Sequence, residues 1–343
     1  MSDRLDLAIW LESQELSKGG QHDNERSQAF EQPGIQVHLN FWKLPDCNAL
    51  DIGIVFPVLK DGKLNIFINT QNEIEVNDIT QLLKRDVVIN TIFNEFIKMT
   101  SCPKENSCIT AERKSENSSD IFCLYCVANP IHLEKKFGGT VITFSIKNIC
   151  NNECGCLSRY IRLRLTGDGI DKLYIKDKIP FSKIEYYTSK REFLDFRLNN
   201  ARSLPRSLLD YSKNYPTLNK VRCFLMIESG DDLSLYNKNY KKVRAIEKEN
   251  WSTYFEGVNP YIQSKESIFD ILTSKGRKKN KAILAYQWNV EDPGPDFSLF
   301  TEIKHSEFSI RTGIFFLAVS SILKLVPSYG GDLIKYVWES LFK

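Results

Sequence analysis

Three residues late in the chain carry the side chains that a metal-dependent hydrolytic site needs. Asp296 and Glu302 are carboxylates, which suit a divalent cation, and Lys304 supplies an ammonium group that can polarise an attacking water. Five residues separate Asp296 from Glu302, and Lys304 follows two positions later. Charged residues that alternate along the exposed face of a strand produce the same pattern, so a plain strand is the alternative interpretation.

Pro295-Asp296 and Glu302-Ile303-Lys304 together resemble the PD-(D/E)xK signature of restriction-type nucleases. The resemblance covers residues 295–304 and no other part of the chain. It implies a metal-dependent nuclease, or another nucleic-acid-processing protein, in which Asp296 and Glu302 bind Mg²⁺ and Lys304 activates water.

Cysteines are concentrated in one region, since seven of the nine fall between Cys102 and Cys156. A structural zinc ion takes four soft ligands, commonly donated as two closely spaced pairs. The natural pairs here are Cys102 with Cys108 and Cys154 with Cys156. The cysteines therefore suggest a structural zinc ion, and ordinary thiols in loops and in the core are the alternative.

The densest basic run lies at residues 275–281 and contains Lys275, Arg277, Lys278, Lys279 and Lys281. Such a run binds phosphate backbones or anionic lipid headgroups when it gathers on one face, and it is otherwise a solvated loop. The formal net charge of the whole chain is only +3, so a nucleic-acid role would depend on such a local patch.

The segment TGIFFLAVSSILKLV (312–326) is apolar on all sides. The 12 residues between Arg311 and Lys324 are uncharged, and as a helix they span about 18 Å, against about 30 Å of membrane hydrocarbon. The stretch 332–343 that follows is amphipathic. We therefore weigh a helical hairpin packed on the protein against membrane contact, which would involve Phe315, Phe316, Leu317 and Trp338.

The remaining pattern predicts an α+β fold: a strand-rich body with an N-terminal helix and a C-terminal pair of apolar and amphipathic helices. Helices are expected at 3–17, 77–98, 205–212 and 266–274, and Asp61-Gly62 predicts a tight hairpin turn. We expect a strand-rich domain at 1–155 that includes the cysteine-rich segment, an α+β recognition domain at 156–307, and the C-terminal hairpin at 308–343. The predicted strands are 34–42, 51–59, 63–70, 120–129, 139–147, 158–169, 171–176, 192–198, 220–228, 242–249, 281–290 and 297–305.

The first hypothesis for function is a non-catalytic binding or sensing protein with a membrane-directed C-terminal tail. This plan resembles that of prokaryotic defence effectors, including antiviral ones, that act on membranes. The alternatives are the nuclease described above and a subunit of a larger complex whose tail is buried against a partner. Without a recognisable signal peptide, we expect a cytoplasmic protein that contacts the inner face of the membrane peripherally. A protein partner, an anionic membrane surface and nucleic acid are the partners to be tested.

Overall fold

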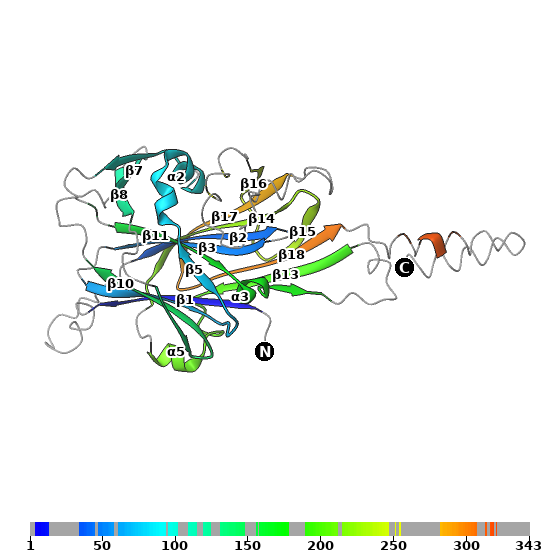
Figure 1. The fold of residues 1–343 in the computed structure, drawn as a ribbon, viewed down its shortest axis with the longest axis horizontal. Helices are drawn as coiled ribbons and strands as arrows, with labels where there is room; N and C mark the ends of the chain where they lie inside the picture. Colours follow the sequence, from blue (N-terminus) through cyan, green and yellow to red (C-terminus); the bar gives the residue numbers. More distant parts are fainter. Residues whose placement is uncertain are drawn as a thin grey trace, which may run out of the picture.

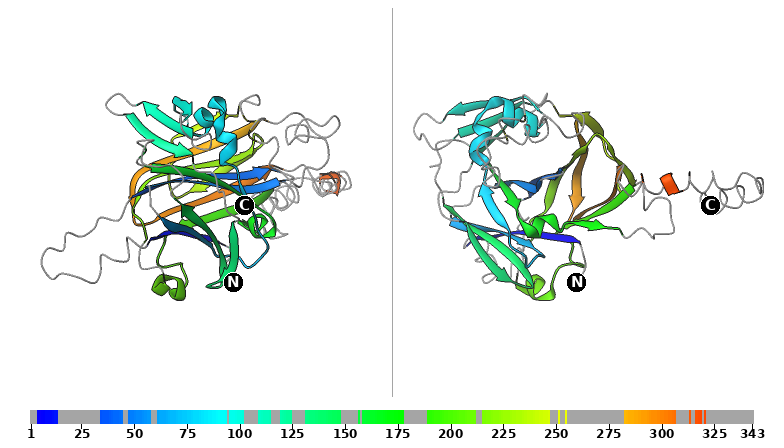
Figure 2. Two further views of the ribbon diagram at one scale, coloured as in Figure 1. Left: turned by 60° about the vertical axis from the view of Figure 1, so that its left-hand side comes forward. Right: turned by 45° about the vertical axis from the view of Figure 1, so that its right-hand side comes forward.

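The computed structural model describes the strands and most of the turns that connect them. The described residues are 4–13, 34–44, 47–57, 61–93, 95–101, 109–114, 119–124, 131–147, 156, 158–177, 189–211, 215–246, 251, 254, 282–306, 313, 316–318 and 320. They form two large β-sheets that lie face to face (Figures 1 and 2).

The first sheet has eight strands in the order β15–β18–β13–β1–β4–β10–β9, with β12 paired to β13. Most neighbouring strands are antiparallel, but β1 and β13 are parallel. Its strands are β1 (Leu5–Ser13), β4 (Asp61–Ile68), β9 (His132–Lys136), β10 (Gly139–Lys147), β12 (Tyr174–Lys176), β13 (Ser189–Leu198), β15 (Asp231–Tyr236) and β18 (Phe297–Ser306).

The second sheet has ten strands in the order β16–β17–β14–β2–β3–β11–β8–β7–β6, with β5 paired to β11. It is also mixed, since β14 runs parallel to β2 and β11 parallel to β8. Its strands are β2 (Ile35–Leu44), β3 (Cys47–Pro57), β5 (Glu75–Asp78), β6 (Ile97–Ser101), β7 (Ile109–Lys114), β8 (Ser119–Leu124), β11 (Ser158–Thr166), β14 (Leu218–Glu228), β16 (Lys242–Ala245) and β17 (Ile283–Gly294).

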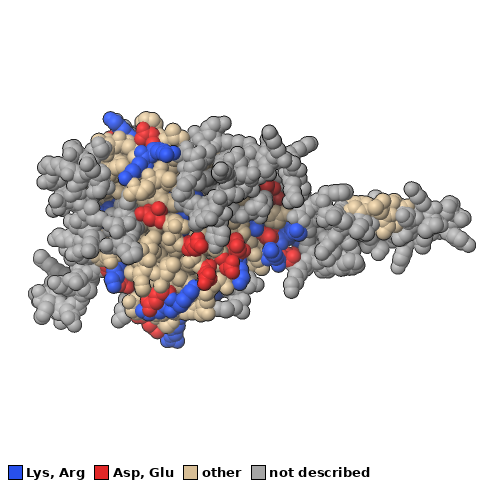
Figure 3. Space-filling model, in the orientation of Figure 1, with Lys and Arg blue, Asp and Glu red and all other residues tan. Residues whose placement is uncertain are grey.

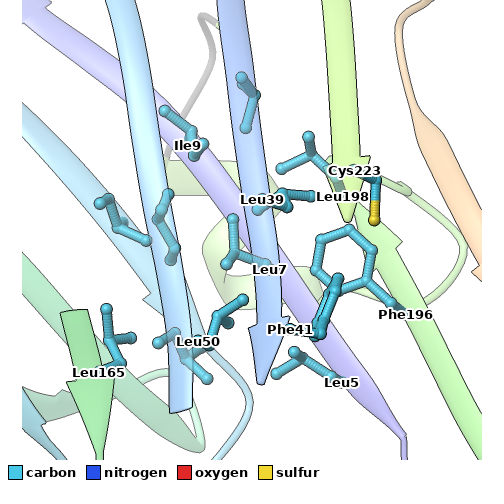
Figure 4. Packing of buried hydrophobic residues seen from close by; sticks show 14 of the residues in the cluster. Leu5, Leu7, Ile9, Leu39, Phe41, Leu50, Leu165, Phe196, Leu198 and Cys223 are labelled. Carbon is cyan, nitrogen blue, oxygen red and sulfur yellow. The ribbon is translucent and has the colours of Figure 1, made fainter. Parts of the chain in front are cut away.

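The main hydrophobic core lies between the two sheets, where alternate residues of each strand meet (Figure 4). On β1 the inward side chains are Leu5, Leu7, Ile9 and Leu11, and all are buried. Across the core, Phe41 of β2 contacts Phe196 of β13 edge to face, with ring centroids 5.1 Å apart. Strands from both sides of residue 155 contribute to this core and pair within both sheets.

Short helices cover the outer faces of both sheets (Figures 1 and 2). The 3-10 helix η1 (Thr80–Lys84) and helix α2 (Asp86–Phe93) pack on the ten-stranded sheet, in a hydrophobic cluster that includes residues of its strands β6–β8. Helix α5 (Arg206–Tyr211) supplies Leu208, which packs on Trp10 and Phe67 of the eight-stranded sheet. Helix α3 (Asp168–Asp171) follows β11 directly. Many strands are therefore buried on both faces.

The expected α+β class is wrong, because strands in two mixed sheets dominate the described residues. The predicted N-terminal helix is strand β1, which lies between β4 and β13. Its inward residues recur every two positions, but Ala8 and Trp10 on the opposite face are buried as well. Burial of both faces makes the apolar residues nearly continuous and hides the period of two.

Other expected elements also differ from the structure. The helix predicted at 77–98 is divided among β5, η1, α2 and β6. Asp61-Gly62 does not form a hairpin, because β3 belongs to the ten-stranded sheet and β4 to the eight-stranded one. The pair of C-terminal helices is not borne out: helical conformation is described only at 313, 316–318 and 320. The helix predicted at 266–274 lies outside the described residues.

Candidate functional site

The outer face of the ten-stranded sheet carries a row of buried polar side chains. Strands β2, β3 and β11 lie side by side there, with Asn40 opposite Asp51 and Asp51 opposite Arg164. Arg162 and His38 flank Gly53 in the next row of the same face. Side chains of this kind are rarely buried without partners, so each one requires an account of its contacts. The buried members of the group are His38, Asn40, Asp51, Arg162, Arg164 and Arg222.

Asp51 is the acceptor at the centre of this group. The Arg164 guanidinium donates two hydrogen bonds to its carboxylate, of 2.7 and 2.9 Å. Trp42 donates from Nε1 at 2.8 Å and Tyr254 from its hydroxyl at 2.6 Å. Burial alone would raise the pKa of Asp51, but the charges of Arg164 and Arg162 outweigh it and lower the pKa below its usual value. Asp51 is therefore a buried carboxylate held in its charged form.

Arg162 is the second buried cation of the group and shares Asp51 with Arg164. Its Nε donates to the hydroxyl of Tyr254 at 2.7 Å, and its Nη1 donates to the hydroxyl of Tyr160 at 2.9 Å. Its Nη2 lies 3.9 Å from the nearer oxygen of Asp51. Burial raises the pKa of both tyrosines above the usual value, so they remain neutral and contribute hydrogen bonds but no charge.

Gly53 gives these side chains room to lie across the sheet. A Cβ at this position would overlap the hydroxyl of Tyr160 and would lie 3.0 Å from Nη1 of Arg162. The absence of a side chain therefore lets Tyr160 and Arg162 reach across β3 toward β2. Tyr160 consequently lies with its hydroxyl 3.4 Å from Nδ1 of His38.

Aromatic side chains cover the polar group from above. Trp251 packs against Trp42 and Tyr254, with ring centroids 5.3 and 5.5 Å apart. At the other end of the group, Phe93 of α2 contacts His38 at 4.8 Å. The cover excludes water, which strengthens electrostatic interactions within the group and raises the free-energy cost of any buried polar atom that is not hydrogen-bonded.

A second charged cluster joins the two sheets at one end of the core. Lys43 of β2 forms an ion pair of 2.9 Å with Glu192 of β13. Glu192 also lies 3.6 Å from Nε2 of His305, whose Nδ1 is 2.9 Å from Asp231 of β15. The ammonium group of Lys43 also lies 4.6 Å from the centre of the Tyr174 ring. Two cations and two carboxylates therefore alternate here and link opposite sheets.

This inter-sheet cluster shifts the pKa values of its members in opposite directions. Burial would lower the pKa of His305, but contact with Asp231 and Glu192 raises it to about 9. Burial would raise the pKa of Glu192, but His305 and Lys43 lower it to about 2. Both groups are therefore charged at neutral pH, and the folded state favours their charged forms.

The raised pKa of His305 predicts a loss of stability at alkaline pH. The protonated imidazole is favoured in the folded state, so its contribution is complete below pH 6.5 and disappears as the pH rises to about 9. We expect the free energy of unfolding to fall by up to about 3 kcal/mol across this interval. Urea titrations at several pH values measure this slope.

A matched pair of variants isolates the contribution of His305. His305→Gln should remove most of the pH dependence between 6.5 and 9, whereas His132→Gln, at an exposed position of β9, should leave it unchanged. An equal slope in wild type and His305→Gln would contradict the assignment of this dependence to the inter-sheet cluster.

Asp296, Glu302 and Lys304 lie in or next to β18 but do not form one site. Asp296 precedes the strand and accepts a 2.6 Å hydrogen bond from Asn200. Glu302 lies six residues further along, about 20 Å at strand spacing, and accepts a 2.6 Å hydrogen bond from Ser234. Lys304 is exposed. The structure thus does not bring the two carboxylates within reach of one cation.

The predicted zinc ligands are mostly outside the described residues. Only Cys156 is described, and it is half-buried just before β11. Cys102, Cys108 and Cys154 lie outside the described part of the chain. Among the residues that the structure describes, no group of three histidine, cysteine, aspartate or glutamate side chains is arranged to hold a metal ion.

The predicted anion-binding run Lys275, Arg277, Lys278, Lys279 and Lys281 also lies outside the described residues. On the face shown in Figure 3, the described basic and acidic side chains are interspersed.

Two of the four predicted membrane-contact residues are described. The side chains of Phe316 and Leu317 are 48% and 68% exposed. Phe315 and Trp338 lie outside the described residues. No helix in the described part of the chain is long and apolar enough to cross a membrane.

The buried polar group was missed in the sequence because its members are distant along the chain. Asp51 is 113 residues from Arg164 and 203 from Tyr254. One signal was present: residues 160–165 of β11 alternate tyrosine or arginine with isoleucine or leucine. Such alternation normally indicates a strand with one solvated face, but here η1, α2 and the aromatic cover bury that face too.

No protein-family model and no curated protein matches the chain. The fold and the site define a two-layer protein of mixed β-sheets with a charged, buried polar group on the outer face of one sheet. What this protein does must therefore be inferred from the geometry of its own residues.

Proposed function

We propose that this chain is a non-catalytic binding protein whose C-terminal segment docks on a membrane surface. The observation that carries the proposal is the helical stretch at 316–318, where Phe316 and Leu317 present large apolar side chains to solvent. Figures 1 and 2 place this stretch away from the two sheets, and it shows as uncharged surface in Figure 3. Adjacent exposed apolar residues are typical of a contact surface.

The body of the protein suits binding better than catalysis. The polar group around Asp51 is held by fixed hydrogen bonds between partners that are all buried. Asp296 and Glu302, which the nuclease alternative requires, are separated, because Asp296 precedes β18 and Glu302 lies six residues further along. These features favour a role for the two packed sheets as a rigid recognition body, with the C-terminal segment as the membrane-directed part.

Flotation with lipid vesicles tests the proposal. We expect the intact chain to float with vesicles of phosphatidylcholine and phosphatidylglycerol. The variant Phe316→Gln/Leu317→Gln should lose at least about tenfold of this partitioning, because burial of each such side chain contributes about 1.5–3 kcal/mol.

A matched control removes two exposed apolar side chains from the body. Phe96→Gln/Leu235→Gln changes positions that are 76% and 53% exposed and should float like the wild type. Equal flotation of all three proteins would contradict a role for the C-terminal segment. If the wild type fails to float but self-associates through Phe316 and Leu317, the complex-subunit alternative replaces the proposal.

A further inference from the structure

The buried polar group on the ten-stranded sheet contains more positive than negative charge. Three guanidinium groups, those of Arg162, Arg164 and Arg222, face two carboxylates, those of Asp51 and Glu95, among the described residues. Arg164 pairs with Asp51, and Arg222 pairs with Glu95 and donates to the carbonyl of Phe93. Arg162 shares Asp51 with Arg164, so among the described residues three buried cations of this group face two carboxylates. Excess charge in a buried group is unfavourable.

Unused hydrogen-bonding atoms lie beside this surplus charge. Among the described residues, Nη2 of Arg162 and both amide atoms of Asn40 are buried without a hydrogen-bond partner. Asn40 is only 1% exposed. Arg222 lies on β14 opposite His38, two positions from Asn40 on the same face. Its Nε also has no hydrogen-bond partner among the described residues. A native fold seldom leaves several such atoms together unless a ligand or water completes them.

The strand register places Asn40 and Arg162 on the same face of the sheet, on the two strands that flank β3. Asn40 is opposite Asp51, and paired residues of adjacent strands have Cβ atoms about 4.5–5.5 Å apart. Arg162 comes from β11, the other neighbour of β3, and its Nη2 lies 3.9 Å from Oδ2 of Asp51. Oδ2 of Asp51 already accepts hydrogen bonds from Arg164, Trp42 and Tyr254, and among the described residues Nη2 of Arg162 and the amide nitrogen of Asn40 donate none.

We infer that Arg162 and Asn40 form a binding site for a small oxyanion, a phosphate or a carboxylate group. Such a group would accept hydrogen bonds from Nη2 of Arg162 and the amide nitrogen of Asn40, and it would balance the surplus charge. The site is independent of the C-terminal segment and of membrane docking. The anionic group would be enclosed under the aromatic cover of Trp251 and Tyr254.

Thermal unfolding of the intact protein in sodium phosphate or sodium acetate, at constant ionic strength set with sodium chloride, tests the inference. We expect the midpoint temperature of the wild type to rise as the concentration of one of the two anions increases, and to level off when the site is full. Saturation with phosphate alone assigns a phosphate group, and saturation with acetate assigns a carboxylate. No saturable rise with either anion overturns the inference.

Asn40→Leu separates binding from structure. Because neither side-chain amide atom of Asn40 has a hydrogen-bond partner among the described residues, the variant should unfold at a higher temperature than the wild type without anion, yet bind the anion at least about tenfold more weakly. Asn65→Leu changes a buried asparagine on the outer face of the other sheet and should keep the wild-type anion response. An undiminished response in Asn40→Leu would overturn the assignment.

Discussion

Replacement of Asp51 with alanine is expected to lower the free energy of unfolding by about 3–5 kcal/mol. The carboxylate accepts hydrogen bonds from Arg164, Trp42 and Tyr254, and its removal takes away the carboxylate that the two buried guanidinium groups of Arg162 and Arg164 share. Equilibrium unfolding in urea, monitored by tryptophan fluorescence, measures the change.

Two further variants show whether burial of the charges causes the large loss of stability in Asp51→Ala. Asp195→Ala breaks the ion pair with Arg197, whose side chains are 20% and 30% exposed, and should cost less than about 1 kcal/mol. The double variant Asp51→Ala/Arg164→Met should recover about 1 kcal/mol or more relative to Asp51→Ala, because one of the two buried cations that shared Asp51 is also removed. A loss of less than 1 kcal/mol in Asp51→Ala would contradict the account of the polar group.

Ile9→Ala is expected to cost about 2–5 kcal/mol. Ile9 is fully buried in the core between the sheets, beside Leu7 and Leu11 of the same strand. In an amphipathic helix with Leu7, Trp10 and Leu11 on its buried face, Ile9 would lie on the opposite, exposed side. The same urea titration therefore tests whether this segment is a central strand.

Leu133→Ala provides the comparison for Ile9→Ala. Leu133 is 42% exposed on β9, at the edge of the same sheet, and its truncation should cost less than about 1 kcal/mol. If Ile9→Ala costs no more than Leu133→Ala, the central position of β1 is contradicted.

Local patterns predicted many of the strands but not how they are arranged. The segment at 139–147 was predicted with the bounds of β10, since its β-branched residues are followed by a polar break. Asp61-Gly62 suggested a hairpin, yet β3 and β4 pair with different partners in different sheets. Strand pairing is set by burial over the whole molecule, and the parallel pairs β1–β13 and β2–β14 join segments that are far apart in the chain.

The polar group was harder to predict than the strands that carry it. Residues such as Arg162 and Asn40 have the composition of a solvated strand face, and only tertiary packing buries them. The catalytic residues suggested by the sequence, Asp296 and Glu302, had the right chemistry but lie apart, Asp296 just before β18 and Glu302 within it. A motif defined by spacing has meaning only when the backbone brings its residues together.

The central claim is that the stretch around Phe316 and Leu317 is the membrane-contacting part of the protein. Hydrogen exchange of the intact chain, with and without vesicles of phosphatidylcholine and phosphatidylglycerol, tests this claim most directly. The proposal predicts that vesicles slow exchange in the peptides that contain residues 313–320 and leave β2, β3 and β11 unchanged. Unchanged exchange at 313–320, or protection confined to the sheets, would contradict it.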